Sequence, residues 1–131
     1  METDATGHAP AIIEVPLASR VLVIGDLLLP AEATDASLSA VAGVSNDLDL
    51  WQGSGTLIIL GDLVEDLEDL SAALAAHPSL LRSLTSFLAP ADRRAVLVPG
   101  TRTKALLDDP SVGGLGLGLE VAHRIELTRT T

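Results

Sequence analysis

The sequence predicts an α/β fold in which strands alternate with helices around a largely parallel sheet. Two observations lead to this prediction. Three apolar runs, at residues 21–24, 56–60 and 95–98, each stop at a turn that contains glycine, and the segments between the runs carry apolar residues at helical spacing. Because strands separated by helices pair in parallel through right-handed crossovers, the three run ends are expected at one edge of the sheet.

The amino-terminal part predicts a tail followed by two strands. Residues 1–10 are small, polar and interrupted by glycine and proline, which is typical of a flexible tail. Residues 11–15 predict an edge strand that Pro16 closes. Residues 21–24 predict the first buried strand, with Gly25 and Asp26 in the turn that ends it. The domain is expected to cover residues 11–131.

The middle of the chain predicts three helices around the central strand. Thr34 and Asp35 are N-cap residues for a helix with Leu38 and Val41 on one face. Residues 56–60 lack polar alternation and predict a strand buried on both faces. Asp62 follows at its end, and apolar spacing predicts a helix over residues 63–74 and another over residues 79–88.

The last part predicts a third buried strand, a short helix and a final strand. Residues 96–98 form the strand, 99–100 its turn and 101–107 the helix. The glycine-rich residues 113–118 do not follow a strand, which favours a flexible link over a dinucleotide-binding loop. Residues 119–128 alternate as a strand or a hairpin arm should. The chain stops directly after it, which predicts a domain truncated at its carboxyl end.

Composition narrows the classes of partner. The chain has 131 residues, the size of one domain, and a formal net charge of −10, which argues against a nucleic-acid partner. It has no cysteine, which excludes disulfides and zinc–thiolate sites. The first residues do not resemble a signal peptide, and no apolar run reaches the length of a membrane span. These features predict a cytoplasmic protein without a membrane segment.

The three strand ends together resemble the motifs of calcineurin-like metallophosphoesterases. That family carries Asp-x-His, Gly-Asp-x-x-Asp/Glu and Gly-Asn-His-Asp/Glu at the ends of successive strands. The matching stretches here are Gly25-Asp26-Leu27-Leu28, Gly61-Asp62-Leu63-Val64-Glu65-Asp66 and Pro99-Gly100-Thr101-Arg102-Thr103. The resemblance covers most of the chain from Val21 onward, and its middle motif is the most specific part.

The resemblance implies a fold, a reaction and a metal centre. The fold is an αββα sandwich, present here in part, and the reaction is hydrolysis of a phosphate ester with two divalent metals, such as Mn, Fe, Zn or Mg. Asp26 resembles the first-site metal ligand, and Asp62 resembles the bridging one. Two adjacent metals need a bridging carboxylate, further ligands and an open position for the nucleophile.

Several positions depart from the family pattern. Leu28 stands where a histidine ligand is usual, Thr101 and Arg102 replace Asn-His, and Thr103 replaces an acidic residue. Two carboxylates are poor support for two metals that each prefer about six ligands. Two hypotheses therefore stand beside each other: a metal-dependent phosphoesterase, and a non-catalytic pseudoenzyme or interaction module that retains the fold. A third alternative is an unrelated doubly wound ligand-binding domain with no second sheet.

The departures also predict what replaces the metals. The guanidinium of Arg102 could bridge Asp26 and Asp62 in place of a cation, which makes Arg102 the candidate catalytic or pseudo-site residue. In a variant of this hypothesis, Gly100, Thr101 and Arg102 bind an anion such as phosphate. The alternatives are that Asp62 caps a helix beginning at Leu63 and that Arg102 is an ordinary surface residue.

The remaining polar residues favour structural roles. The acidic residues Glu65, Asp66, Glu68 and Asp69 predict a solvated first helical turn. His77 and His123 are expected to be partly buried structural residues. If the second sheet is absent, the uncovered apolar face of the first predicts self-association.

Overall fold

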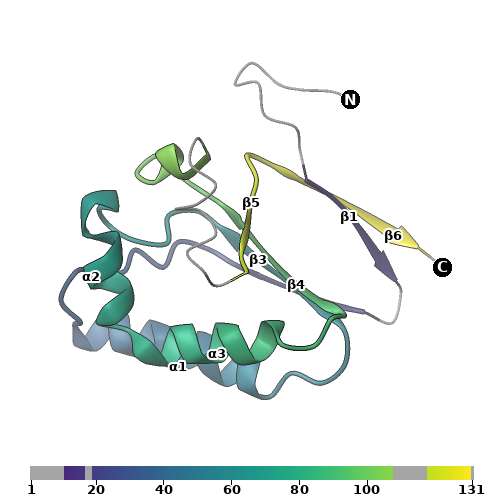
Figure 1. Ribbon diagram of the computed structural model, residues 1–131, viewed down its shortest axis with the longest axis horizontal. Helices are drawn as coiled ribbons and strands as arrows, with labels where there is room; N and C mark the ends of the chain where they lie inside the picture. Colours follow the sequence, from purple (N-terminus) through teal and green to yellow (C-terminus); the bar gives the residue numbers. More distant parts are fainter. Residues whose placement is uncertain (1–10, 17–18, 108–117, 131) are drawn as a thin grey trace.

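A computed structural model describes residues 11–16, 19–107 and 118–130 of the protein. Its main sheet is parallel and has the strand order β2-β3-β4-β5. These strands are β2 (Arg20–Ile24), β3 (Gly55–Leu60), β4 (Arg93–Val98) and β5 (Glu120–Val121). The helices α1 (Asp35–Asp49), α2 (Leu70–Ala75) and α3 (Pro78–Leu88) lie between the strands in sequence (Figure 1). The prediction of an α/β fold with parallel strands alternating with helices is confirmed.

The main hydrophobic core lies between this sheet and the helices. Helices α1 and α3 cover one face of the sheet (Figure 1), and Leu57 and Ile59 of β3 are completely buried. Residues 55–59 of β3 are buried on both faces of the sheet, as the apolar sequence predicts, whereas Leu60 at the end of the strand is half exposed. In the same core, the rings of Trp51 and Phe87 meet edge to face, with centroids 5.0 Å apart.

A second, smaller sheet packs on the opposite face. Strand β1 (Ala11–Pro16) pairs in parallel with β6 (Ile125–Thr130). Ile13 and Val15 of β1 are buried in a second apolar cluster together with Val96 and Ala122. The molecule therefore has three layers, with helices, the main sheet and a two-stranded sheet in that order (Figure 1).

The prediction of a single strand over residues 119–128 is wrong. Strand β5 pairs with β4 of the main sheet, whereas β6 pairs with β1 of the small sheet. The chain leaves the main sheet at Ala122, whose N–H donates to the Leu97 carbonyl oxygen at 3.0 Å. Apolar and polar residues alternate in sequence on both sides of this change of layer, so the pattern alone does not reveal the break.

The prediction of a helix over residues 63–74 is also wrong in its first half. Residues 63–65 run extended beside Leu29: the Leu29 N–H donates to the Leu63 oxygen at 3.0 Å, and the Glu65 N–H donates to the Leu29 oxygen at 3.1 Å. These groups are no longer available to a helix. A 3₁₀ turn (Leu67–Asp69) precedes α2, and the predicted helix over residues 101–107 is reduced to a 3₁₀ turn (Lys104–Leu107).

The starts of the two long helices follow the sequence signals. Thr34 is the N-cap of α1: its hydroxyl oxygen accepts from the Ser37 N–H at 3.0 Å, and the Ser37 hydroxyl accepts from the Thr34 N–H at 2.8 Å. This reciprocal pair is a capping box. Pro78 occupies the first turn of α3, where its missing N–H costs nothing.

Part of the main sheet's second face stays uncovered by the small sheet. Val23, Leu60 and Leu127 are 49 %, 47 % and 50 % exposed and border a groove of about 340 Å³. We call Val23, Ile58, Leu60, Val98, Ile125 and Leu127 the apolar face.

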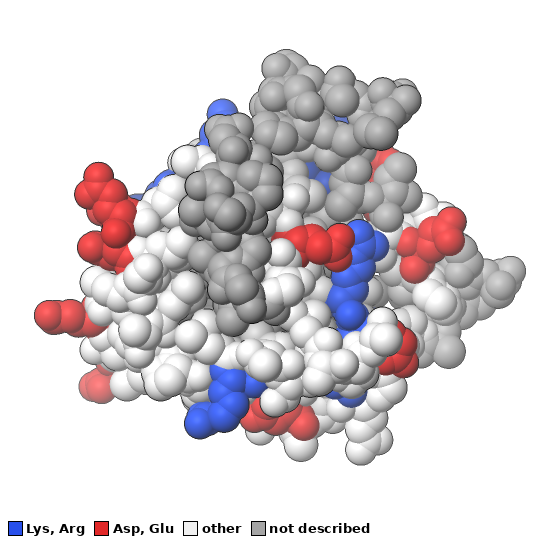
Figure 2. All heavy atoms as spheres, viewed as in Figure 1, with Lys and Arg blue, Asp and Glu red and all other residues white. Residues whose placement is uncertain are grey.

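In the view of Figure 2, acidic side chains lie mostly near the edges, and one lies near the middle beside a basic side chain. Among the described residues, no helix is long and apolar enough to cross a membrane. The predicted tail at residues 1–10 and most of the glycine-rich link, residues 113–117, lie outside the described residues.

Candidate functional site

The turns after β2, β3 and β4 meet at one edge of the sheet, as the sequence predicts. The side chain of Asp26 and the main chain of Asp62 are in direct contact: the Asp62 N–H donates to Asp26 Oδ1 at 2.6 Å. In return, the N–H groups of Leu27 and Leu28 donate to the Asp62 carbonyl oxygen at 3.1 Å and 3.0 Å. The first two strand ends are thus joined through a carboxylate and three main-chain N–H groups.

The turn after β2 carries backbone strain. Leu28 has a φ of +46°, in the left-handed region that a bulky L-residue rarely adopts. This conformation holds its N–H against the Asp62 oxygen. Leu28 is the position at which the resemblance would place a metal-binding histidine, and here its backbone, rather than its side chain, contacts the neighbouring strand end.

The carboxylate of Asp62 is buried and held by the third strand end. Its Oδ1 accepts from the Thr103 hydroxyl at 2.7 Å and from the Thr103 N–H at 3.0 Å. Its Oδ2 accepts from the Arg102 N–H at 3.3 Å. Asp62 is only 6 % exposed, and Thr103 is completely buried. A buried carboxylate needs such donors, because burial removes the water that would otherwise solvate its charge. We call Asp26, Asp62, Arg102 and Thr103 the carboxylate lock.

Two glycines make this close approach feasible. Gly61 has a φ of +125°, and a Cβ at this position would lie 1.9 Å from Asp26 Oδ1. A Cβ at Gly100 would lie 2.9 Å from both carboxylate oxygens of Asp62. The glycines of the second and third motifs therefore leave room for the two aspartates.

The predicted guanidinium bridge from Arg102 does not form in the structure. The Arg102 side chain is exposed, and its Nη1 donates to the Glu65 carbonyl oxygen at 3.5 Å, at the limit of a hydrogen bond. Only its main-chain N–H reaches Asp62. The reason is that Thr103 and the main chain already supply the donors that the Asp62 carboxylate needs.

At the turn predicted to bind an anion, the acceptor in the structure is an internal carboxylate. The N–H groups of Arg102 and Thr103 converge on one carboxylate, as they would on a phosphate, and that carboxylate belongs to Asp62. Gly100 lies against the same group, whereas Thr101 is exposed. An external anion would have to displace Asp62 from these amides.

The residues at this edge do not fit the two-metal centre that the resemblance implies. Both Asp62 oxygens and one Asp26 oxygen already accept hydrogen bonds, and Leu28 offers no ligand atom. Within the described part of the chain, no group of three or more histidine, cysteine, aspartate or glutamate side chains could hold a metal ion. A dinuclear site needs several more oxygen or nitrogen ligands than these two aspartates supply.

The other candidate residues lie apart from the lock. Glu65, Asp66, Glu68 and Asp69 are exposed, as predicted. Asp66 caps the 3₁₀ turn by accepting from the Glu68 N–H at 3.0 Å. His123 is half-buried in the turn between β5 and β6. His77 is more buried than predicted, with none of its surface exposed.

Sequence reasoning missed the roles of Thr103 and Ser37. The family pattern marks Thr103 only as the replacement of an acidic residue. A hydroxyl after a glycine turn is nevertheless a suitable donor to a buried acid. Ser37 stands three residues after the N-cap Thr34, and a serine there can close a capping box, which was the available signal.

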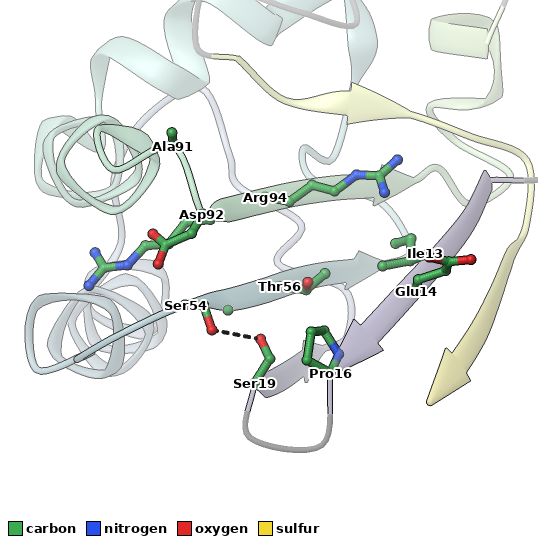
Figure 3. Close-up of a pocket in the computed structure, with 11 residues that line it drawn as sticks. Ile13, Glu14, Pro16, Ser19, Ser54, Thr56, Ala91, Asp92 and Arg94 are labelled. Carbon is green, nitrogen blue, oxygen red and sulfur yellow. Dashed lines mark hydrogen bonds between the residues drawn. The ribbon is translucent and has the colours of Figure 1, made fainter. Parts of the chain in front are cut away.

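A further hollow of about 300 Å³ lies at the opposite ends of the strands (Figure 3). Glu14 and Pro16 come from β1, Ser19 precedes β2, and Asp92 and Arg94 lie at the start of β4. The Ser54 hydroxyl donates to Ser19 Oγ at 3.2 Å (Figure 3). The Arg94 guanidinium is paired with Glu120, whose hydrogen bond raises the pKa of Arg94 against the opposing effect of burial.

Comparison of the chain with models of protein families, with characterised proteins and with solved structures finds no match.

We expect Asp62→Asn to destabilise the fold by about 1.5–3 kcal/mol, because the amide loses charge-assisted hydrogen bonds and turns N–H groups toward other donors. Thr103→Val should lower the free energy of unfolding by about 0.5–1.5 kcal/mol, because it removes one hydroxyl donor to Asp62. The double variant should lose less stability than the sum of the two single variants, since both changes affect the same contact. Urea unfolding measures the free energy of unfolding of all three variants.

The control is Asp66→Asn, the same substitution at an exposed cap where asparagine and aspartate serve equally. Its unfolding midpoint should stay close to that of the wild type. Equal effects of the substitution at positions 62 and 66 would contradict the lock.

We expect Gly61→Ala to destabilise the fold by at least about 1–3 kcal/mol, because its φ suits glycine and its Cβ would collide with Asp26. Gly43→Ala is the matched control. A Cβ at Gly43, within α1, meets nothing within 4 Å, so alanine there should stabilise by about 0.5–1 kcal/mol. Thermal unfolding of the two variants should shift in opposite directions.

Proposed function

We propose that this chain is a metallophosphoesterase-like domain that no longer hydrolyses phosphate esters and serves as a binding or assembly module. The observation that supports this proposal is that the buried Asp62 carboxylate already accepts three hydrogen bonds from Thr103 and Arg102. The residue that the resemblance assigns to the bridging position acts here as a structural acceptor. Where the family has further ligands, Leu28 is apolar, and Arg102 and Thr103 donate to Asp62.

The energetics favour this module over the alternative of an active phosphoesterase. To bridge two cations, Asp62 would have to exchange three hydrogen bonds for metal bonds, leaving the buried Thr103 hydroxyl without an acceptor. An unsatisfied buried donor costs about 1–3 kcal/mol. The gain from metal binding would be small, because so few further ligands converge on the edge.

The test is metal-dependent hydrolysis of p-nitrophenyl phosphate and bis-p-nitrophenyl phosphate with Mn²⁺. We expect the wild type to release p-nitrophenol no faster than Asp26→Asn, and Mn²⁺ to leave its melting temperature unchanged, because the carboxylates are already occupied. A Mn²⁺-dependent rate that Asp26→Asn abolishes, or micromolar Mn²⁺ binding by calorimetry, would establish the alternative.

We infer that the apolar face is the assembly surface and that a second copy of this chain covers it. Val23, Leu60 and Leu127 are each about half exposed on it. Arg124, just before β6, pairs with Glu126 of that strand at 3.3 Å, which places one charge of each sign beside the face. A two-fold axis can set each of these charges against its opposite in the second copy, so the surface is self-complementary.

We expect the wild type to sediment as a dimer and Leu60→Glu to sediment as a monomer, because the new carboxylate would be buried without a partner at the contact. Leu38→Glu, on α1, changes a leucine of the same 47 % exposure and should remain dimeric. A wild type that stays monomeric at the highest concentration tested would contradict the inference.

A further inference from the structure

A buried histidine and serine are paired on the helical side of the molecule, apart from the carboxylate lock. His77 has none of its surface exposed, and its Nε2 lies 2.8 Å from Ser37 Oγ. Its Nδ1 lies 2.7 Å from the Ala73 carbonyl oxygen. A carbonyl oxygen only accepts, so Nδ1 donates to it, and in the tautomer with its proton on Nδ1 the Nε2 atom can accept from the serine.

The Ser37 hydroxyl is placed between three neighbours. Its oxygen accepts from the Thr34 N–H at 2.8 Å, and its single proton can point to His77 Nε2 at 2.8 Å or to the Thr34 carbonyl oxygen at 3.1 Å. With the proton on the shorter contact, one lone pair of the oxygen remains without a donor. This is the arrangement of a nucleophile, a base and a group that orients the base.

Ser37 also lines a hollow of about 340 Å³. Leu27, Leu28, Pro30 and Ala40 form its apolar side, and Thr34, Ser37 and Glu65 contribute polar groups. A hollow of this size accepts a small ligand, and its apolar side suits a short acyl chain.

The first turn of α1 supplies main-chain donors beside the serine. The capping box uses the N–H groups of Thr34 and Ser37. Asp35 and Ala36 lie between them, and by position their N–H groups have no acceptor within the helix. Negative charge that develops on a substrate oxygen near this turn would be stabilised by these groups and by the helix dipole.

We propose that Ser37 and His77 form a nucleophile–base pair that hydrolyses a small carboxylic ester bound in this hollow. Ser37 Oγ attacks the ester carbonyl carbon while its proton moves to His77 Nε2. The carbon–oxygen bond to the alcohol then breaks, and the alcohol leaves with that proton. Water, deprotonated by His77, attacks the acyl-serine and releases the carboxylic acid. The sum is ester plus water to acid plus alcohol, with no other reactant.

If Ser37 and His77 only join α1 to the turn between α2 and α3, Ser37 should be unreactive. A fluorophosphonate probe and p-nitrophenyl acetate distinguish the two roles in the intact chain. We expect the probe to add to Ser37, located by peptide mass spectrometry, and p-nitrophenol release to disappear in Ser37→Ala. His77→Gln should slow labelling by about 100-fold or more, the usual contribution of a general base.

The matched control is Ser83→Ala. Ser83 is also a buried serine, 3 % exposed, but its hydroxyl donates to Asp49 Oδ1 at 2.9 Å and has no histidine beside it. This variant should keep the wild-type labelling and esterase rates. Circular dichroism shows whether each variant is folded. If His77→Gln does not fold, the comparison of the wild type with Ser37→Ala tests the nucleophile–base proposal.

A folded wild type that the probe does not label at Ser37, or that releases p-nitrophenol no faster than Ser37→Ala, would overturn the proposal. Neither result bears on the phosphate-ester test, because Ser37 and His77 do not belong to the carboxylate lock.

Discussion

The burial of the Asp62 carboxylate is the constraint on which the arrangement of the strand ends depends. A charge with 6 % exposure must be met by donors, and the donors come from the turn after β4, at Arg102 and Thr103. The Asp62 main chain in turn contacts the turn after β2 through Asp26 and Leu28. Three loops that are distant in sequence are therefore held by one residue.

This lock also bears on function, because the same atoms serve either structure or ligand binding. The oxygens of Asp62 would be metal ligands in an active phosphoesterase, and the N–H groups of Arg102 and Thr103 would suit a phosphate. Here these groups bind each other. By contrast, Ser37 lines a hollow and its hydroxyl contacts His77, and these two observations are the basis of the esterase activity proposed for the helical side.

Local signals predicted local structure well. The apolar run that became β3, the cap at Thr34 and the proline at the start of α3 each depend on neighbours in sequence. The predictions that were wrong concern segments whose backbone pairs with distant residues. Residues 63–65 follow Leu29 instead of forming a helix, and the chain changes sheets after Ala122.

By itself, the sequence determined that the chain forms a parallel α/β fold and that Asp26, Asp62 and the turn at residues 100–103 share one edge, because strand periodicity and crossover handedness act at short range. Only the tertiary structure decided that Asp62 accepts from Thr103 rather than from the Arg102 guanidinium, and that His77 meets Ser37 from 40 positions away. Such contacts require that side chains on different elements are placed to within a few tenths of an ångström. No spacing along the chain specifies that placement.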